Sequence, residues 1–182
     1  MNKLIEDLIL IKKDSDIIMA LQSGQEIERT WIVKEMPPKE ELTIEHDRVH
    51  SVIQDYILLD GSGELRTRKV LYINTKKIAY DMAIKIGNGM IRTEVLKQLT
   101  PDEWKSLHKV AKGSLQQTLI PCYTSVIHIY KGKLNGLVLV EVEFPNISES
   151  KKFIPPYWFG REVTNDIRFR GKSLAFSDGI PQ

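Results

Sequence analysis

The stretch Leu137-Val138-Leu139-Val140-Glu141-Val142-Glu143-Phe144 decides the fold, because it joins two patterns that a surface strand does not combine. Its first four residues are continuously apolar, which is typical of a strand covered on both faces. Glu141 and Glu143 follow two residues apart, and therefore lie on one face of the same strand. Carboxylates at the end of such a strand need cationic partners or a metal ion. The stretch therefore predicts a covered sheet face that carries charge.

Pairs of charged side chains at the same spacing recur in earlier segments that alternate like strands. From residue 26 to residue 34, acidic and polar residues fall on one face and mostly apolar residues, among them Trp31, on the other. Taken alone, each charged pair is typical of the solvent face of an antiparallel sheet. A closed barrel with charge inside explains all the segments together, and helices would cover its apolar outer face. The inward candidates are Glu26, Glu28, Arg66, Arg68, Lys85, Arg92, Glu94, Glu141 and Glu143.

The order of the other elements predicts an α+β chain built round an antiparallel sheet or barrel. Glycine-rich turns at 60–63 and 87–89 are strong hairpin signals. A helix begins at Pro101, where Thr100 can cap it and Glu103 completes a capping box. The apolar face of this helix is Trp104, Leu107, Val110 and Ala111, and Gly113 ends it. The predicted strands are residues 26–34, 54–59, 65–70, 77–86, 90–96, 123–130 and 137–144.

The chain divides into a short extension and one domain. Residues 1–24 carry two short helical patterns and predict an N-terminal helical extension, which would cover one barrel mouth or form a homodimer contact. Residues 25–182 then form the barrel domain, and its tail at 153–169 is predicted as a short helix or loop that packs on the barrel.

The length, composition and charge of the chain limit the class of protein to which it can belong. The chain has 182 residues, 42% of them hydrophobic, and a net charge of +2. These values predict a soluble protein with no general attraction to nucleic acid or membranes. The single Cys122 excludes an internal disulfide, and no apolar run reaches the roughly 20 residues of a membrane helix. We therefore expect a cytoplasmic protein.

The charged set points to a ligand that is both anionic and metal-bound. Paired glutamates are hard oxygen donors that suit Mg²⁺ or Mn²⁺. Arginine and lysine donate to phosphate oxygens, and the planar guanidinium does so with two hydrogen bonds at once. A polyphosphate fits this combination best.

The charged segments, in their order, resemble the motifs of the CYTH superfamily. These are the triphosphate tunnel metalloenzymes, which include class IV adenylyl cyclases, thiamine triphosphatases and inorganic tripolyphosphatases. The resemblance runs from Gln25 to about Ala175. The matching segments are Glu26-Ile27-Glu28, Gln54-Asp55-Tyr56-Ile57, Leu65-Arg66-Thr67-Arg68, Ala83-Ile84-Lys85, Arg92-Thr93-Glu94, the stretch from Gly136 to Phe144, and a tail with Pro156, Trp158, Gly160, Glu162, Val163, Thr164 and Asp166.

The resemblance implies an eight-stranded antiparallel tunnel with a polar interior and flanking helices. It implies that the metal site is drawn from Glu26, Glu28, Glu141 and Glu143. The residues it implies for phosphate binding are Arg66, Arg68, Lys85 and Arg92. Glu28, Glu94 and Lys85 are the candidate catalytic residues.

Several tunnel positions depart from the superfamily pattern and leave part of the tunnel neutral or apolar. A lysine is replaced at Thr30 and a glutamate at Leu96. We expect His128 to be packed or hydrogen-bonded rather than a catalytic base. The usual K-x-R falls at Gln117 and Leu119, and an acidic pair falls at Val126 and His128.

Two functions therefore stay open at the level of sequence. The first is metal-dependent hydrolysis of a triphosphate substrate, either inorganic tripolyphosphate or a nucleoside triphosphate. The second is a catalytically weakened or inactive protein that binds nucleotide or polyphosphate in order to sequester or sense it. We favour the hydrolase because all its metal ligands survive, and favour it over an adenylyl cyclase because no adenine-reading feature is visible. A module that uses the fold only for interaction is the third hypothesis.

Overall fold

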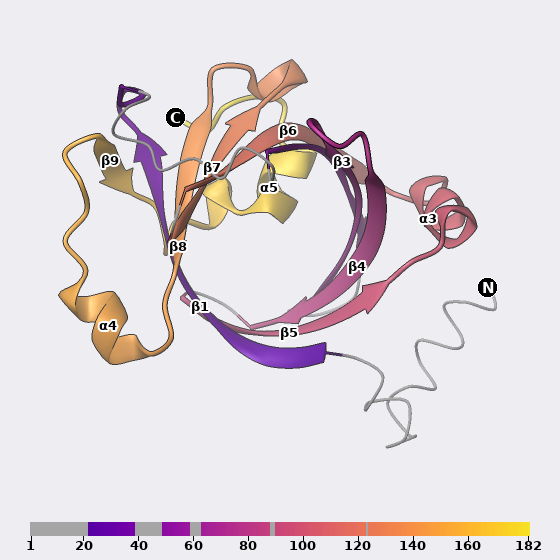
Figure 1. Ribbon diagram of the computed structural model, residues 1–182, viewed down its shortest axis with the longest axis horizontal. Helices are drawn as coiled ribbons and strands as arrows, with labels where there is room; N and C mark the ends of the chain where they lie inside the picture. The colour runs from indigo at the N-terminus through magenta and orange to yellow at the C-terminus, as the bar shows by residue number, and fades with distance from the viewer. Residues whose placement is uncertain (1–21, 39–48, 59–62, 88–89, 123) are drawn as a thin grey trace.

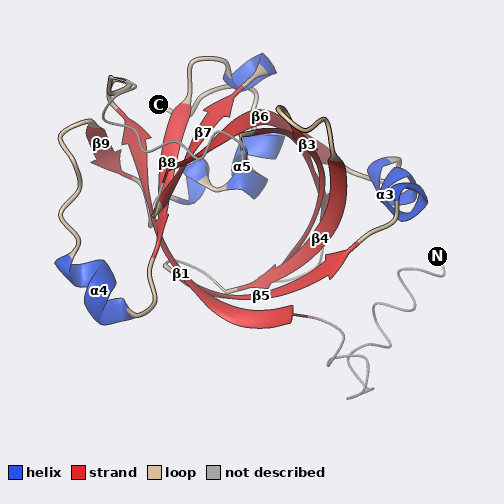
Figure 2. Ribbon diagram, viewed as in Figure 1, coloured by secondary structure: helices blue, strands red, loops and turns tan. Residues whose placement is uncertain are grey.

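A computed structural model describes residues 22–38, 49–58, 63–87, 90–122 and 124–182. Within them, eight antiparallel strands close into a barrel (Figures 1 and 2), which confirms the predicted α+β class and closed eight-stranded architecture. The first and fifth strands pair to close the ring. The strands are β1 (Gln22–Val33), β2 (His50–Leu58), β3 (Gly63–Tyr72), β4 (Ile78–Ile86), β5 (Ile91–Gln98), β6 (Gly113–Cys122), β7 (Ser125–Tyr130) and β8 (Val138–Glu143).

Alternation along β1 divides its side chains between the cavity and an outer core. Glu26 and Glu28 face the cavity, whereas Ile27 is buried and Trp31 is only 2% exposed. Trp31 packs in an outer apolar cluster with Ile127 of β7 and Val140 of β8, among others. Because each strand alternates in this way, the interior can stay polar while the outer face is covered.

The outer cluster is covered by the chain that follows β8. This segment contains α4 (Ile147–Lys152) and a short strand, β9 (Phe159–Glu162), which pairs with β1 outside the ring (Figure 1). Phe153 and Phe159 contact the Trp31 ring, with ring centroids 5.6 Å and 5.0 Å away. The tail predicted as a short helix or loop therefore does pack on the barrel, but it contributes a strand as well.

The central helix, α3 (Pro101–His108), begins as predicted. The Thr100 side chain accepts from the backbone N–H of Glu103 at 3.3 Å, and the Glu103 carboxylate accepts from the Thr100 N–H at 2.7 Å. Trp104 and Leu107 are buried against the outer face of β3 and β4. The helix stops at His108, however, so the prediction that Val110 lies on its apolar face is wrong, and Val110 is exposed.

Strand β6 was not predicted. Its central residues, Gln116, Gln117 and Thr118, give it no apolar alternation that sequence reasoning recognises. The strand nevertheless pairs with β2 on one side and β7 on the other, because a closed barrel with a polar interior accepts a glutamine on its inner face. Gln117 is 2% exposed.

Short helical segments connect β7 to β8 and follow β9 at the C-terminal end. A 3₁₀ turn, η3 (Gly132–Leu134), joins β7 to β8, and the positive φ of 65° at Gly132 favours glycine there. At the C-terminal end, η4 (Ile167–Phe169) and α5 (Gly171–Phe176) follow β9.

The C-terminal segment closes one end of the barrel. Phe169 and Leu174 pack in one cluster with the inward-facing side chains of Tyr56, Tyr130 and Leu139. Gly171 lies so close to Tyr56 that a Cβ atom there would collide with the phenol oxygen. The helices predicted for the end of the chain are therefore present, and they end the cavity near Tyr56.

The boundary of the predicted extension moves. β1 begins at Gln22, so residues 22–24 of the predicted helical extension Met1–Gly24 form strand and pair with β5. The other residues of the extension, 1–21, lie outside the described residues. In the part of the chain that the structure describes, no helix is long and apolar enough to cross a membrane.

We expect the outer apolar cluster to carry much of the stability. Ile127 is fully buried in it, so Ile127→Ala should lower the free energy of unfolding by about 2–5 kcal/mol through lost contacts and a residual cavity. Ile154 is 86% exposed, and Ile154→Ala should change that free energy by no more than about 0.5 kcal/mol. Urea unfolding of both variants measures the difference, and equal losses would contradict this packing.

Candidate active site inside the barrel

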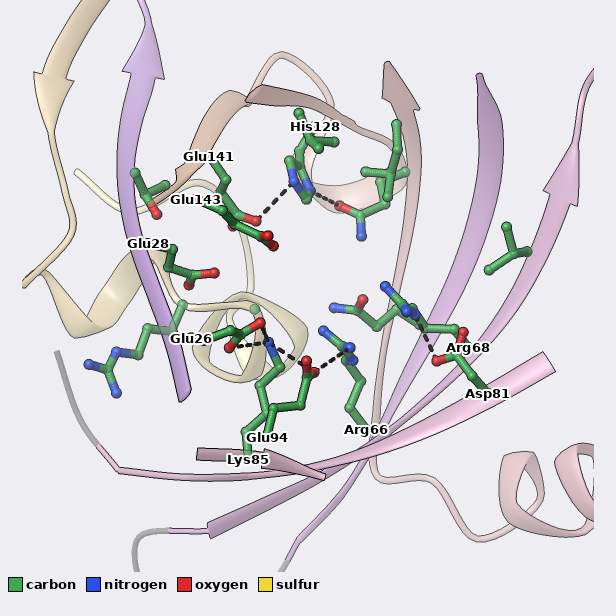
Figure 3. A pocket seen from close by; sticks show the side chains of 18 of the residues that line it. Glu26, Glu28, Arg66, Arg68, Asp81, Lys85, Glu94, His128, Glu141 and Glu143 are labelled. Carbon is green, nitrogen blue, oxygen red and sulfur yellow. Dashed lines mark hydrogen bonds and ion pairs between the residues drawn. The ribbon is translucent and has the colours of Figure 1, made fainter. Parts of the chain in front are cut away.

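The barrel encloses a cavity of about 600 Å³ whose wall holds every charged residue predicted to face inward. In Figure 3, Glu28, Glu141 and Glu143 approach it from one side and Arg66 and Arg68 from the other. The predicted set is therefore brought together, from β1, β3, β4, β5 and β8. These residues are Glu26, Glu28, Arg66, Arg68, Lys85, Arg92, Glu94, Glu141 and Glu143.

Lys85 is the centre of an ion-pair network in this cavity. Its Nζ lies 2.8 Å and 2.9 Å from the two carboxylate oxygens of Glu26, and 3.2 Å from Oε1 of Glu94. Arg66 Nη2 contacts the same Glu94 oxygen at 3.1 Å. Only 6% of the Lys85 side chain is exposed, so these two carboxylates replace the water that would otherwise surround its ammonium group.

Arg92 extends the network along β1. Its Nη2 pairs with Glu28 and lies 3.4 Å from Oε2 of Glu26. The pairing follows from the closure of the barrel, since Glu26 and Arg92 are register partners where β1 meets β5. Three cations, Lys85, Arg66 and Arg92, therefore converge on the carboxylates of Glu26, Glu28 and Glu94.

Arg68 is held separately from the network. Its Nε donates to Oδ1 of Asp81 at 2.9 Å, and the two residues are register partners on β3 and β4. Asp81 is buried, with 6% exposed, whereas the Arg68 side chain is partly exposed. Sequence reasoning missed Asp81, although its spacing of four residues from Lys85 on one strand places both on the same face.

Carboxylates outnumber cations where β1 meets β8. Glu28 and Glu143 are register partners, and Glu141 precedes Glu143 on the same face. Burial, and then the charge of Glu141, raise the pKa of Glu28 to about 7, against the opposing effect of Arg92. Burial followed by Glu26 and Glu141 also raises the pKa of Glu143. This side of the cavity therefore attracts a cation.

Glu94 and Glu141 behave in the opposite way. Burial alone would raise the pKa of Glu94, but Lys85 and Arg66 lower it. Burial likewise acts against ionisation of Glu141, yet His128 and the cations bring its pKa to about 2. Both carboxylates are therefore charged at neutral pH.

His128 occupies the position where an acidic residue was expected. Its Nδ1 lies 3.2 Å from the side-chain oxygen of Gln117, and its Nε2 is at ion-pair distance, 3.0 Å, from Oε2 of Glu141 without hydrogen-bond alignment. The expectation of a hydrogen-bonded histidine is confirmed. The other positions that depart from the superfamily pattern line the cavity too, so part of the cavity wall is uncharged. These positions are Thr30, Leu96, Gln117, Leu119 and Val126.

The carboxylate oxygens in the cavity are suitable ligands for a hard divalent cation, but two of the carboxylates contact basic side chains in this structure. Glutamate oxygens are ligands that Mg²⁺ and Mn²⁺ accept. Among the described residues, no three His, Cys, Asp or Glu side chains are gathered so that they could hold a metal ion as they stand. Glu26 and Glu28 point at Lys85 and Arg92 instead. Glu26 and Glu28 would have to leave these cations in order to hold a metal ion.

Sequence reasoning also missed wall residues from outside the recognised pairs. Glu64 lies two residues before Arg66 on β3, and strand alternation could have found it. Arg170 comes from the C-terminal segment, where no periodic pattern marks it. Gln54 donates to the Tyr56 hydroxyl at 2.7 Å beside the closed end of the barrel.

Comparison with known proteins places the chain among characterised relatives. An inorganic triphosphatase of Nitrosomonas europaea is 32% identical over 161 residues, which are 84% of this chain and 97% of that protein. An inorganic triphosphatase of Acetivibrio thermocellus is 28% identical over 131 residues, 66% of this chain and 77% of that protein. A crystal structure of an inorganic triphosphatase matches with a TM-score of 0.57 and 30% identity, over 86% of this chain and 97% of the other. No model of a protein family matches the chain.

The raised pKa of Glu28 predicts a measurable pH effect. Between about pH 4.5 and 7 the folded protein holds a proton at Glu28 that the unfolded chain has released. The contribution of Glu28 to the unfolding free energy therefore falls as pH rises through this window. Glu28→Gln resembles the protonated form, so it should match the wild type near pH 5 and exceed its stability at pH 8, by on the order of 1–3 kcal/mol.

Urea unfolding of both proteins at the two pH values measures this difference. Glu149→Gln is the matched control, because Glu149 is exposed on α4 and pairs with Lys152 across one turn. Parallel pH dependence of the wild type and Glu28→Gln would contradict the raised pKa.

Proposed function

The chain belongs to the family of inorganic triphosphatases, and from this premise we propose that it binds a metal-complexed triphosphate inside the barrel and hydrolyses it. We infer that it is a triphosphatase, a hydrolase of phosphoric anhydrides, and that its architecture is that of the CYTH superfamily. The observation that carries the proposal is the convergence of Arg66, Lys85 and Arg92 in one enclosed, carboxylate-rich cavity. Inorganic tripolyphosphate or a nucleoside triphosphate is the substrate class.

The cations are suited to hold the phosphate chain. Arg66, Lys85 and Arg92 already meet three carboxylates, and phosphate oxygens offer them the same charge-assisted hydrogen bonds. Each such bond contributes about 1.5–3 kcal/mol, so a triphosphate competes well with the internal pairs. Arg68, held by Asp81, is available as a further donor on the adjacent strand.

We assign the metal site to Glu26, Glu28, Glu141 and Glu143, which would hold Mg²⁺ or Mn²⁺. When bound, the metal supplies neutralisation of the charge on the phosphate oxygens. Burial, and after it repulsion among these carboxylates, raises the pKa of Glu28 and Glu143. The repulsion supports the assignment because a divalent cation would relieve it. The cytoplasmic location and the homodimer expected from the sequence stay predictions.

The hydrolysis requires the protein to position the triphosphate and to accept one proton from the attacking water. The oxygen of water forms a bond to the terminal phosphorus, the bridging P–O bond breaks, and pyrophosphate leaves from inorganic triphosphate. The proton of the water passes to a carboxylate. Glu28 is the candidate for this step because its carboxylate lies in the cavity wall, next to Glu141 and Glu143 of the neighbouring strand. Glu94, held ionised by Lys85 and Arg66, keeps those cations in position.

The catalytic proposal is tested by phosphate and pyrophosphate release from tripolyphosphate and a panel of nucleoside triphosphates, with Mg²⁺ or Mn²⁺. Glu28→Gln and Glu143→Gln should abolish turnover. Arg66→Ala should lower kcat by about 10²–10³, the cost of removing one donor to developing charge. Glu149→Gln, on the exposed α4, should keep wild-type turnover. Chelation of the metal should stop the reaction and added Mg²⁺ or Mn²⁺ should restore it.

The binding alternative makes a different prediction in the same assay. The neutral residues on β6 and β7 favour it, because they remove cations and carboxylates that the resemblance leads one to expect. Tight binding of a triphosphate without turnover would support a sequestering or sensing protein. Absence of both binding and turnover for every ligand would contradict both functions.

The pairing of the carboxylates also predicts that metal and triphosphate bind cooperatively. Glu26 and Glu28 are engaged by Lys85 and Arg92 in the structure, so Mn²⁺ alone should bind weakly. A triphosphate that takes over the two cations frees the carboxylates, and Mn²⁺ affinity should then rise about tenfold or more. Calorimetric titration of Mn²⁺ with and without a non-hydrolysable triphosphate analogue measures the coupling. Equal affinities would show that the internal pairs do not compete with the ligands.

A further inference from the structure

An apolar cluster lies inside the barrel, on the same wall as the charges. Its buried members are Val52, Val70 and Leu119, with Tyr72, Ala79 and Val126 packed against them. All except Val52 line the cavity. This cluster is distinct from the outer core, because its members share the inward faces of their strands with Gln54, Arg68 and Gln117.

The apolar cluster occupies the end of the cavity away from the C-terminal segment. Tyr56, which that segment covers, pairs with Arg66, whereas His50 pairs with Tyr72 at the other end of the same two strands. Val70 follows Arg68 by two residues on β3, and Val126 is the register partner of Glu141. The inner face of β3 therefore changes from charged to apolar within two residues, between Arg68 and Val70.

The apolar side chains at this end of the wall offer no hydrogen bond to a phosphate group. Apolar side chains give phosphate oxygens no hydrogen bonds, and burying an ionised group without partners is unfavourable. An uncharged organic group is favoured there by the hydrophobic effect. At the edge of the cavity the rings of His50 and Tyr72 lie 5.5 Å apart at 49°, which adds an aromatic surface to the apolar one.

We propose that this apolar end binds the organic group of a triphosphate monoester, preferably an aromatic one, while the triphosphate extends toward Arg66, Lys85 and Arg92. The proposal rests on the proposed function and narrows its substrate class. In the reaction, the oxygen of water bonds to the terminal phosphorus and the bridging P–O bond breaks. Orthophosphate and the organic diphosphate leave, and the proton of the water is released to solvent through a carboxylate.

The test compares phenyl triphosphate with methyl triphosphate, two monoesters of equal charge that differ in the organic group. The wild type should show at least about a tenfold higher kcat/KM for the phenyl ester, as pocket contacts of this size produce. Leu119→Ala should lower the phenyl-to-methyl ratio by about tenfold, and Leu119→Met, which keeps the volume, should retain most of it. Calorimetric Kd values for the two esters give the same ratio independently of turnover.

Ile120→Ala is the matched control. Ile120 is the next residue on β6, but it packs in the outer cluster around Trp31 and does not line the cavity. This variant removes a comparable apolar group and should leave the ratio unchanged, while Tm values of both variants report any general loss of stability. Equal kcat/KM and Kd for the two esters in the wild type would overturn the apolar subsite, and turnover of tripolyphosphate in the same assay would leave the proposed function intact. Absence of binding by tripolyphosphate and by both esters would overturn both.

Discussion

Mutual neutralisation of charges inside a closed barrel is the constraint on which the rest of the structure depends. Lys85 is almost fully withdrawn from water, and the carboxylates of Glu26 and Glu94 both contact its ammonium group. A buried ion without such partners costs several kcal/mol, which is a large part of the stability of a domain this size. The cavity can therefore hold cations for a polyphosphate only if it also holds carboxylates. Two of these carboxylates, Glu26 and Glu28, are also among those that we assign to the metal.

The closure of the barrel at β1 brings these opposite charges together. The first part of β1 pairs with β5 and places Glu26 opposite Arg92, whereas the second part pairs with β8 and places Glu28 opposite Glu143. Strand β1 thus lies between β5, which carries Arg92, and β8, which carries Glu143. Glu28 has a raised pKa although it pairs with Arg92, first because it is buried and then because Glu141 acts on it from the other neighbour. The position of β1 at the closure therefore sets the electrostatics of the site.

The inner faces were predictable from sequence wherever charges alternate along a strand, and the partners of those charges were not. The spacing of Arg66 and Arg68 fixes their common face, but the contact of Arg68 with Asp81 depends on the register of β3 with β4. Strand β6 was missed because hydrophobic alternation is the usual signal of a strand, and here a glutamine occupies the buried inner face. Arg170 was missed because an irregular segment carries it to the cavity. The local pattern of a strand predicts which side chains share a face, whereas the ion pairs between strands depend on the register in which those strands pair.

The uncharged part of the cavity wall, on β6 and β7, also follows from the need to pair every buried charge. Relative to the pattern that the chain resembles, β6 lacks two cations, at Gln117 and Leu119, and β7 lacks two carboxylates, at Val126 and His128. The two strands are neighbours, and Leu119 is the register partner of His128. Loss of one set alone would leave buried charges without partners, whereas loss of both sets together leaves none. Gln117 and Glu141 then share His128, and the remaining cations stay with their own carboxylates. In this chain the uncharged positions on β6 and β7 lie next to one another, and the cations on β3, β4 and β5 keep their own carboxylate partners.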